Sequence, residues 1–151
     1  RKAAEQGHAK SQLHLGVMYS SGAGIPQDNS ESAKWFQKAA EQGLADAQHF
    51  LGLCYAFGTG VHVDDVAAVK WYRKAAEQGH VEAQFKLGLM YYKGRGAPED
   101  DVVAYMWWNL SAAQGHKDAK NNKDIIYKDM TREQIAEAQK LSREWVAKRQ
   151  K

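Results

Sequence analysis

One segment, KWYRKAAEQGH, recurs along the chain at a fixed spacing of 36 residues. Lys70–His80 carries it in full, Lys34–Leu44 reads KWFQKAAEQGL, Met106–His116 reads MWWNLSAAQGH, and Arg1–His8 keeps only the tail RKAAEQGH. A fixed period between about 20 and 50 residues is typical of stacked repeat proteins, in which each unit buries its core against its neighbours. The period therefore predicts a helical repeat protein.

The period also sets the expected division of the chain. We expect the end of a truncated repeat helix at 1–8, three repeats at 9–44, 45–80 and 81–116, and a degenerate repeat with a C-terminal cap at 117–151. All five segments are expected to form one solenoid domain. The sequence begins inside a repeat and without a methionine, so we expect a fragment with an unknown number of repeats before it, in which a signal peptide is not assessable.

The first half of each repeat predicts a helix that another helix approaches closely. AKSQLHLGVMYSSG aligns with ADAQHFLGLCYAFG and VEAQFKLGLMYYKG, and each contains a Leu-Gly pair followed by a tyrosine. Glycine inside a helix costs about 1 kcal/mol relative to alanine. Its recurrence at Gly16, Gly52 and Gly88 therefore predicts a close helix–helix contact at each position.

The second half of each repeat predicts a turn and a second helix. Paired glycines permit a tight reversal, and Asp28, Asp64 and Asp100 follow where an N-cap is favoured. Trp35 and Trp71 then recur at one repeat position, which is typical of a buried face rather than of a base-stacking platform. The turn glycines match neither phosphate-binding fingerprint, and no strand is predicted before them.

The last segment predicts a cap. Lys123 and Asp124 replace the Leu-Gly pair, and Thr131 and Gln134 have the spacing of a capping box. Atypical charged terminal repeats keep a solenoid from exposing an apolar end. The expected apolar stripe of the last helix comprises Ile135, Ala138, Leu141, Trp145 and Val146.

Composition and spacing favour no catalytic, cofactor or metal site. The net charge is +3, and the weakly basic tail falls far short of a nucleic-acid-binding stripe. The six histidines lack the spacing of a helical metal site, and Asp64–Asp65 and Asp100–Asp101 stand where acids favour a helix N-terminus. Cys54 is the only cysteine, and its place in a helix pattern indicates a buried thiol. No apolar run is long enough to span a bilayer.

These repeats, A-x-A-Q-x-x-L-G-x-x-Y-x-x-G-x-G-x-x-x-D followed by K-W-Y-x-K-A-A-E-Q-G-H-x-x-A, closely resemble the Sel-like repeat family, which is related to the tetratricopeptide repeats. The resemblance extends from Arg1 to Tyr127 and implies a bacterial protein with a right-handed superhelix of antiparallel helix pairs. It also implies a scaffold or adaptor, in the periplasm, secreted or in the cytoplasm. Cysteine-rich relatives are linked to penicillin binding and β-lactamase-like activity, but a single cysteine departs from their paired bridges.

By the same resemblance, residues that the repeat leaves variable in its first helix line a concave groove. The groove is expected to bind a peptide or helical segment of a protein partner, with aromatic side chains as anchors. The alternative is that some of these residues pack between neighbouring helices. The candidates are Leu13, Val17, His49, Leu53, Phe57, Phe85, Leu89, Tyr92 and Lys93.

Two classes of function follow from these observations. The favoured one is a non-catalytic protein-interaction scaffold without a cofactor, and the alternative is an enzyme or binder for a cell-wall or β-lactam-like ligand. Sustained nitrocefin hydrolysis would exclude the scaffold interpretation. Self-association through the truncated repeat at Arg1 is a third possibility, which sedimentation would test. Phe85→Ala with Tyr92→Ala is expected to weaken partner binding and to leave helicity intact.

Overall fold

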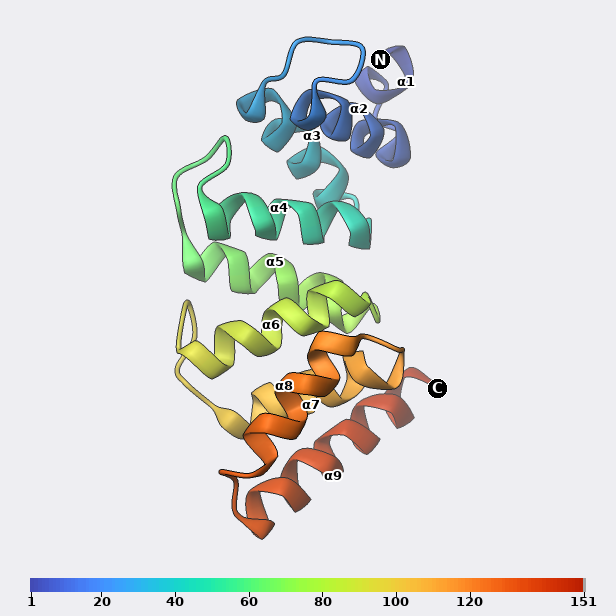
Figure 1. Cartoon of the computed structure of the whole chain (residues 1–151). Helices are drawn as coiled ribbons and strands as arrows, with labels where there is room; N and C mark the ends of the chain where they lie inside the picture. Colours follow the sequence, from blue (N-terminus) through green and yellow to red (C-terminus); the bar gives the residue numbers. More distant parts are fainter. Residues whose placement is uncertain (151) are drawn as a thin grey trace. The chain divides into compact units, whose positions relative to one another are not determined.

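The structure is a computed structural model that describes residues 1–150. These residues form nine α-helices and no strand, which confirms the predicted all-α repeat fold (Figure 1). Each repeat helix ends within a few residues of a turn that the sequence predicts. The helices are α1 (Lys2–Glu5), α2 (Ala9–Ser21), α3 (Asn29–Glu41), α4 (Ala45–Phe57), α5 (Asp65–Glu77), α6 (Val81–Lys93), α7 (Asp101–Ala113), α8 (Lys117–Tyr127) and α9 (Arg132–Arg149).

The chain divides into two compact units, Arg1–His80 and Val81–Lys151. We call α2, α4, α6 and α8 the A helices and α3, α5 and α7 the B helices. In the first unit α2 packs on α3, α3 on α4, and α4 on α5. In the second unit α7 is the central helix, because α6, α8 and α9 all pack against it.

The helix ends are fixed by side chains and glycines at the predicted positions. Asp28, Asp64 and Asp100 each precede a B helix, and each side chain accepts a hydrogen bond from a backbone N–H of the first turn. Such a cap satisfies one of the donors that a helix start leaves unpaired. Gly43 follows α3 with φ of 91°, a left-handed conformation that favours glycine.

The glycine inside each A helix makes room for an aromatic ring of the following B helix. A Cβ atom added at Gly52 would lie 2.6 Å from Cδ1 of Tyr72, and one at Gly16 would lie 2.7 Å from Cδ1 of Phe36. Trp108 occupies the same relation to Gly88. These distances are too short for any carbon contact. The predicted close approach is therefore confirmed, and an aromatic side chain produces it.

The repeated tryptophans and glutamines form the interior of the units. Trp35 and Trp71 are 6% and 5% exposed, as expected for core. Buried Gln48 accepts a hydrogen bond of 2.8 Å from Gln78 and donates to the carbonyl oxygen of Ala40. Each glutamine satisfies polar groups that helix packing would otherwise bury unpaired. Each such glutamine therefore holds neighbouring helices together as well as filling the core.

The last helix, α9, packs against α7. Thr131 and Gln134 form the capping box at the start of α9, and Ala138 is fully buried. Trp145 packs edge-on against Trp107, with ring centroids 6.0 Å apart. Val146 differs from the predicted stripe because it is 42% exposed and lies at the end of α9, where the cover on α7 is incomplete.

Candidate functional site: the A-helix surfaces

The nine candidate binding residues differ widely in exposure. Phe57, Tyr92 and Val17 are exposed at 67%, 44% and 37%, and Lys93 is also exposed. These side chains are available to a partner in the structure as it stands. Of the other five, His49 is buried. The remaining four are partly buried: Leu13, Leu53, Phe85 and Leu89.

His49 and Phe85 are held by other rings of their own units. The His49 ring is 9% exposed and stacks on His80, with centroids 4.7 Å apart. Phe85 stacks on His116 at 4.4 Å, and its backbone carbonyl accepts a hydrogen bond from Trp108. Both side chains therefore contribute to packing, which is the alternative that the sequence left open for part of this set.

Three of the candidates meet at one hollow in the second unit, which we call the Trp108 pocket. Its volume is about 230 Å³. Trp108 itself is only 1% exposed, while Tyr92 and Ile125 leave much of their side chains open. The pocket is thus apolar and open to solvent, with one charged side chain at its edge. Its lining residues are Leu89, Tyr92, Lys93, Trp108, Asn122, Ile125 and Ile126.

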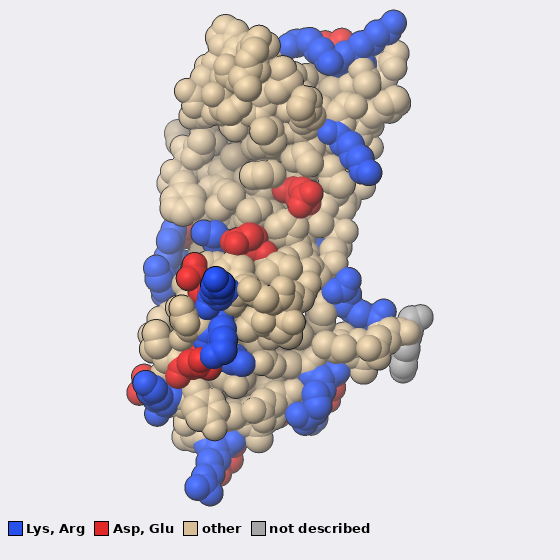
Figure 2. Space-filling model, turned by 45° about the vertical axis from the view of Figure 1, so that its right-hand side comes forward, with Lys and Arg blue, Asp and Glu red and all other residues tan. Residues whose placement is uncertain are grey.

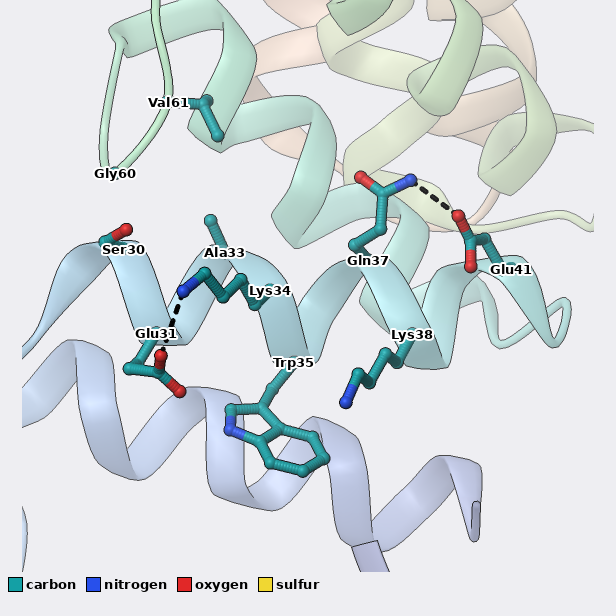
Figure 3. A pocket seen from close by; sticks show the side chains of 10 residues that line it. All are labelled: Ser30, Glu31, Ala33, Lys34, Trp35, Gln37, Lys38, Glu41, Gly60 and Val61. Carbon is teal, nitrogen blue, oxygen red and sulfur yellow. Dashed lines mark hydrogen bonds and ion pairs between the residues drawn. The ribbon is translucent and has the colours of Figure 1, made fainter. Parts of the chain in front are cut away.

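A larger hollow of about 620 Å³ lies over α3 in the first unit, beside the loop that contains Gly60 and Val61 (Figure 3). Its polar side chains are largely engaged with one another. Lys34 pairs with Glu31 at 3.1 Å, and Gln37 donates a hydrogen bond to Glu41 at 2.7 Å. No candidate from the sequence lines this hollow, and its polar groups do not converge on a common point (Figure 3).

Two further A-helix residues, which are not among the nine candidates, belong to the exposed surface. Ile125 is 59% exposed and Tyr127 50%. The signal for Ile125 was present, because it lies one repeat length after Leu89. It was not among the candidates because the variable positions of the degenerate repeat at 117–151 were not compared with those of the regular repeats; in the structure α8 packs on α7 as an A helix does.

The single thiol is buried, as the sequence predicts. Cys54 is 6% exposed and lies in the core cluster that contains Leu51 and Trp71. Burial raises the pKa of Cys54 from 9.0 to about 11. A thiol with a raised pKa is a weak nucleophile at neutral pH, because the thiolate is the reactive form.

Cys54 gives a prediction for reactivity and for pH dependence. Iodoacetamide is expected to alkylate Cys54 at pH 8 far more slowly in the folded protein than in urea, which mass spectrometry would measure. The folded pKa lies above the unfolded one, so the stability that the neutral thiol contributes is present below pH 9 and is lost as pH rises toward about 11. Cys54→Ala should lack this part of the decline. Equal alkylation rates in both states would contradict the buried assignment.

Of the two acidic residues at the start of α7, Asp100 caps the helix. Asp100 accepts a hydrogen bond of 3.0 Å from the backbone N–H of Val103. Burial, followed by the charges of Glu99 and Asp100, raises the pKa of Asp101. Among residues 1–150 no group of three or more His, Cys, Asp or Glu side chains is arranged to hold a metal ion.

Surface charge is mixed in sign. Over the second unit, basic and acidic side chains lie close together on the face that Figure 2 shows, without an extended field of one sign. Lys120 and Asp124, for example, pair at 2.8 Å. Within the described part of the chain, no helix has the length and apolar character needed to cross a membrane.

Helix pairs of constant length, with a fixed aromatic core and variable A-helix surfaces, define a helical repeat protein of the solenoid class. Comparison with known families identifies the kind of repeat. The Sel1 repeat model matches residues 1–8, 9–44, 45–80 and 81–116. The chain belongs to the Sel1 repeat family, and the resemblance noted in the sequence is confirmed. Proteins of this fold are generally non-catalytic scaffolds for protein interactions.

Solved structures of bacterial proteins are similar to the chain. A Sel1 repeat protein from Oxalobacter formigenes is 39% identical, with a TM-score of 0.75 over 82% of this chain and 92% of that one. The protective antigen c5321 of uropathogenic Escherichia coli, which displays an SLR fold, is 30% identical, with a TM-score of 0.76 over 97% of this chain and 39% of that one.

A third structure bears on the enzymatic alternative. Cysteine rich protein B of Helicobacter pylori is 26% identical, with a TM-score of 0.63 over 80% of this chain and 92% of that one. Its name describes a cysteine-rich protein, whereas this chain has one cysteine. No curated protein matches the chain.

Proposed function

We propose that the protein is a non-catalytic adaptor whose A-helix surfaces bind a peptide or helical segment of a partner protein. The observation that carries this proposal is the position of the exposed apolar side chains. Among residues 1–150, five of the eight large apolar residues that remain exposed lie on A helices. These five are Val17, Phe57, Tyr92, Ile125 and Tyr127.

The contrast with the framework positions supports the proposal. Residues that recur in every repeat, such as Leu51 and Trp71, are buried and hold the fold. The exposed positions vary from repeat to repeat, so the fold does not require an apolar side chain there. Phe57, for example, corresponds to Ser21 in the preceding repeat. Exposed aromatic side chains on a rigid helix are typical anchors of protein interfaces.

Single substitutions separate binding from packing. Tyr92→Ala is expected to weaken partner binding at least tenfold and to lower the free energy of unfolding by about 0.5–1.5 kcal/mol, because its ring packs against that of Trp108. Phe85→Ala is expected to cost more stability, because Phe85 stacks on His116. Binding of the partner by calorimetry and unfolding in urea would measure both effects.

The matched control is Val66→Ala. Val66 is 68% exposed but lies on the B helix α5, so its truncation should change neither binding nor stability. Partner binding that is lost equally in Val66→Ala and Tyr92→Ala would contradict an interface on the A helices.

A further inference from the structure

The internal repeat shows why the Trp108 pocket is open. Trp108 lies two repeat lengths after Phe36, and Asn122 lies two repeat lengths after Phe50. Trp108 and Asn122 therefore occupy the repeat positions that Phe36 and Phe50 occupy in the first unit. In the first unit, Phe50 stacks on Phe36 with ring centroids 5.1 Å apart and an interplanar angle of 14°. In the second unit the shorter Asn122 stands in place of Phe50, and the Trp108 ring packs instead against Tyr92, with ring centroids 5.5 Å apart. A hollow of about 230 Å³ remains beside Asn122.

The size of the hollow restricts what it can hold. Sites for whole small molecules span roughly 300–1,000 Å³. The Trp108 pocket is smaller than this, which suits one large side chain better than a free ligand. At the corresponding place in the first unit the chain supplies a phenylalanine, so the fold itself shows that an aromatic ring fits between a B helix and the A helix that follows it.

The edge of the pocket adds a preference for charge. Lys93 is its one charged lining residue, and no acidic side chain lines it. Within residues 1–150 Lys93 has neither an ion pair nor a side-chain hydrogen bond. The corresponding residues of the other repeats are Ser21 and Phe57, so this cation is particular to the second unit. A carboxylate placed beside an anchored ring would complement it.

We propose that the Trp108 pocket anchors an aromatic side chain of the partner protein, in a segment that carries an Asp or Glu next to that side chain. This inference rests on the proposed adaptor function and specifies the chemistry of the partner at one place. The ring lies against Leu89, Tyr92 and Ile125, and the carboxylate pairs with the Lys93 ammonium group.

The first test uses 3-phenylpropionate, which joins a benzene ring to a carboxylate. Methyl and aromatic NMR signals of Leu89, Tyr92 and Ile125 are expected to shift saturably, with a Kd in the millimolar range usual for a ligand of about 11 non-hydrogen atoms. Lys93→Gln should weaken binding of the carboxylate at least threefold. It should leave binding of the neutral 3-phenylpropanamide unchanged. Equal loss for both probes would overturn the role of Lys93.

The second test fills the pocket from within. Asn122→Phe restores the residue type found at Phe50 and is expected to weaken 3-phenylpropionate binding at least tenfold. The matched control is Asn121→Phe, which adds the same ring at an exposed neighbouring position and should leave binding unchanged. Circular dichroism and the urea midpoint verify that both variants fold. Undiminished binding to a folded Asn122→Phe variant, or no saturable shift in the wild type, would overturn the proposal.

Failure of this inference is distinguishable from failure of the adaptor function. A partner that binds Asn122→Phe as tightly as wild type, but is lost on Tyr92→Ala or Phe57→Ala, excludes the Trp108 pocket and retains the A-helix interface. A partner that is unaffected by all three substitutions excludes both.

Discussion

Gly52→Ala is expected to lower the free energy of unfolding by about 1–2 kcal/mol, although alanine is the better helix former. The added Cβ would lie 2.6 Å from the ring of Tyr72, which is 1% exposed and has no room to move. Overpacking of a core costs about 1–3 kcal/mol. The higher helix propensity of alanine contributes about 1 kcal/mol in the opposite direction, which offsets only part of this cost. Urea unfolding followed by circular dichroism measures the difference.

The sharpest control is the same substitution without the ring. In a Tyr72→Ala background, Gly52→Ala meets no aromatic side chain and should raise the free energy of unfolding by about 1 kcal/mol, through helix propensity alone. All four proteins, with Gly52 or Ala at position 52 and with or without Tyr72→Ala, would be measured in the same concentration of sucrose. Sucrose favours the folded state of the destabilised Tyr72→Ala background. An effect of the same sign in both backgrounds would show that the ring of Tyr72 is not what requires Gly52.

Leu51→Ala and Leu53→Ala form a second pair with a large expected difference. Leu51 is fully buried in the core cluster of the first unit, so its truncation should cost about 2–5 kcal/mol. Leu53, two residues later on the same helix, is only partly buried. Its truncation removes less buried area and should cost about 1 kcal/mol or less.

The two variants should also differ in binding. Leu53→Ala is expected to weaken partner binding while the protein stays folded, whereas Leu51→Ala is expected to act through stability. Chemical denaturation and partner titration on the same samples would measure both. Equal losses of stability at the two positions would show that Leu53 belongs to the core and would remove it from the candidate surface.

The framework could be predicted from the sequence because repetition and local chemistry determine it together. Asp64 caps α5 through its own side chain, and Gly43 ends α3 through its own backbone, so neither depends on distant packing. The requirement for Gly52 also followed from its recurrence, since a residue that weakens a helix recurs only where space demands it. The sequence did not reveal which neighbour demands it, and the structure identifies Tyr72.

The exposure of the candidate binding residues was harder to predict because it depends on which neighbours cover each position. His49 and Leu13 occupy the same repeat position, yet His49 is buried by the rings of Tyr72 and His80. At the Trp108 pocket, Asn122 stands in the place of Phe50, and the hollow beside it appears only when the helices are packed together. A helical period assigns a residue to a face, but it does not say how fully that face is covered.

The central claim is that a partner protein contacts the A helices and not the B helices. Its most direct test is photocrosslinking with p-benzoylphenylalanine placed at Phe57, at Tyr92 and, as control, at Val66, in extract from the native host. All three side chains are exposed, but only the first two lie on A helices. Mass spectrometry should identify adducts with peptides of one partner at Phe57 and Tyr92 and none at Val66. The same adducts at all three positions, or none at Phe57 and Tyr92, would contradict the account.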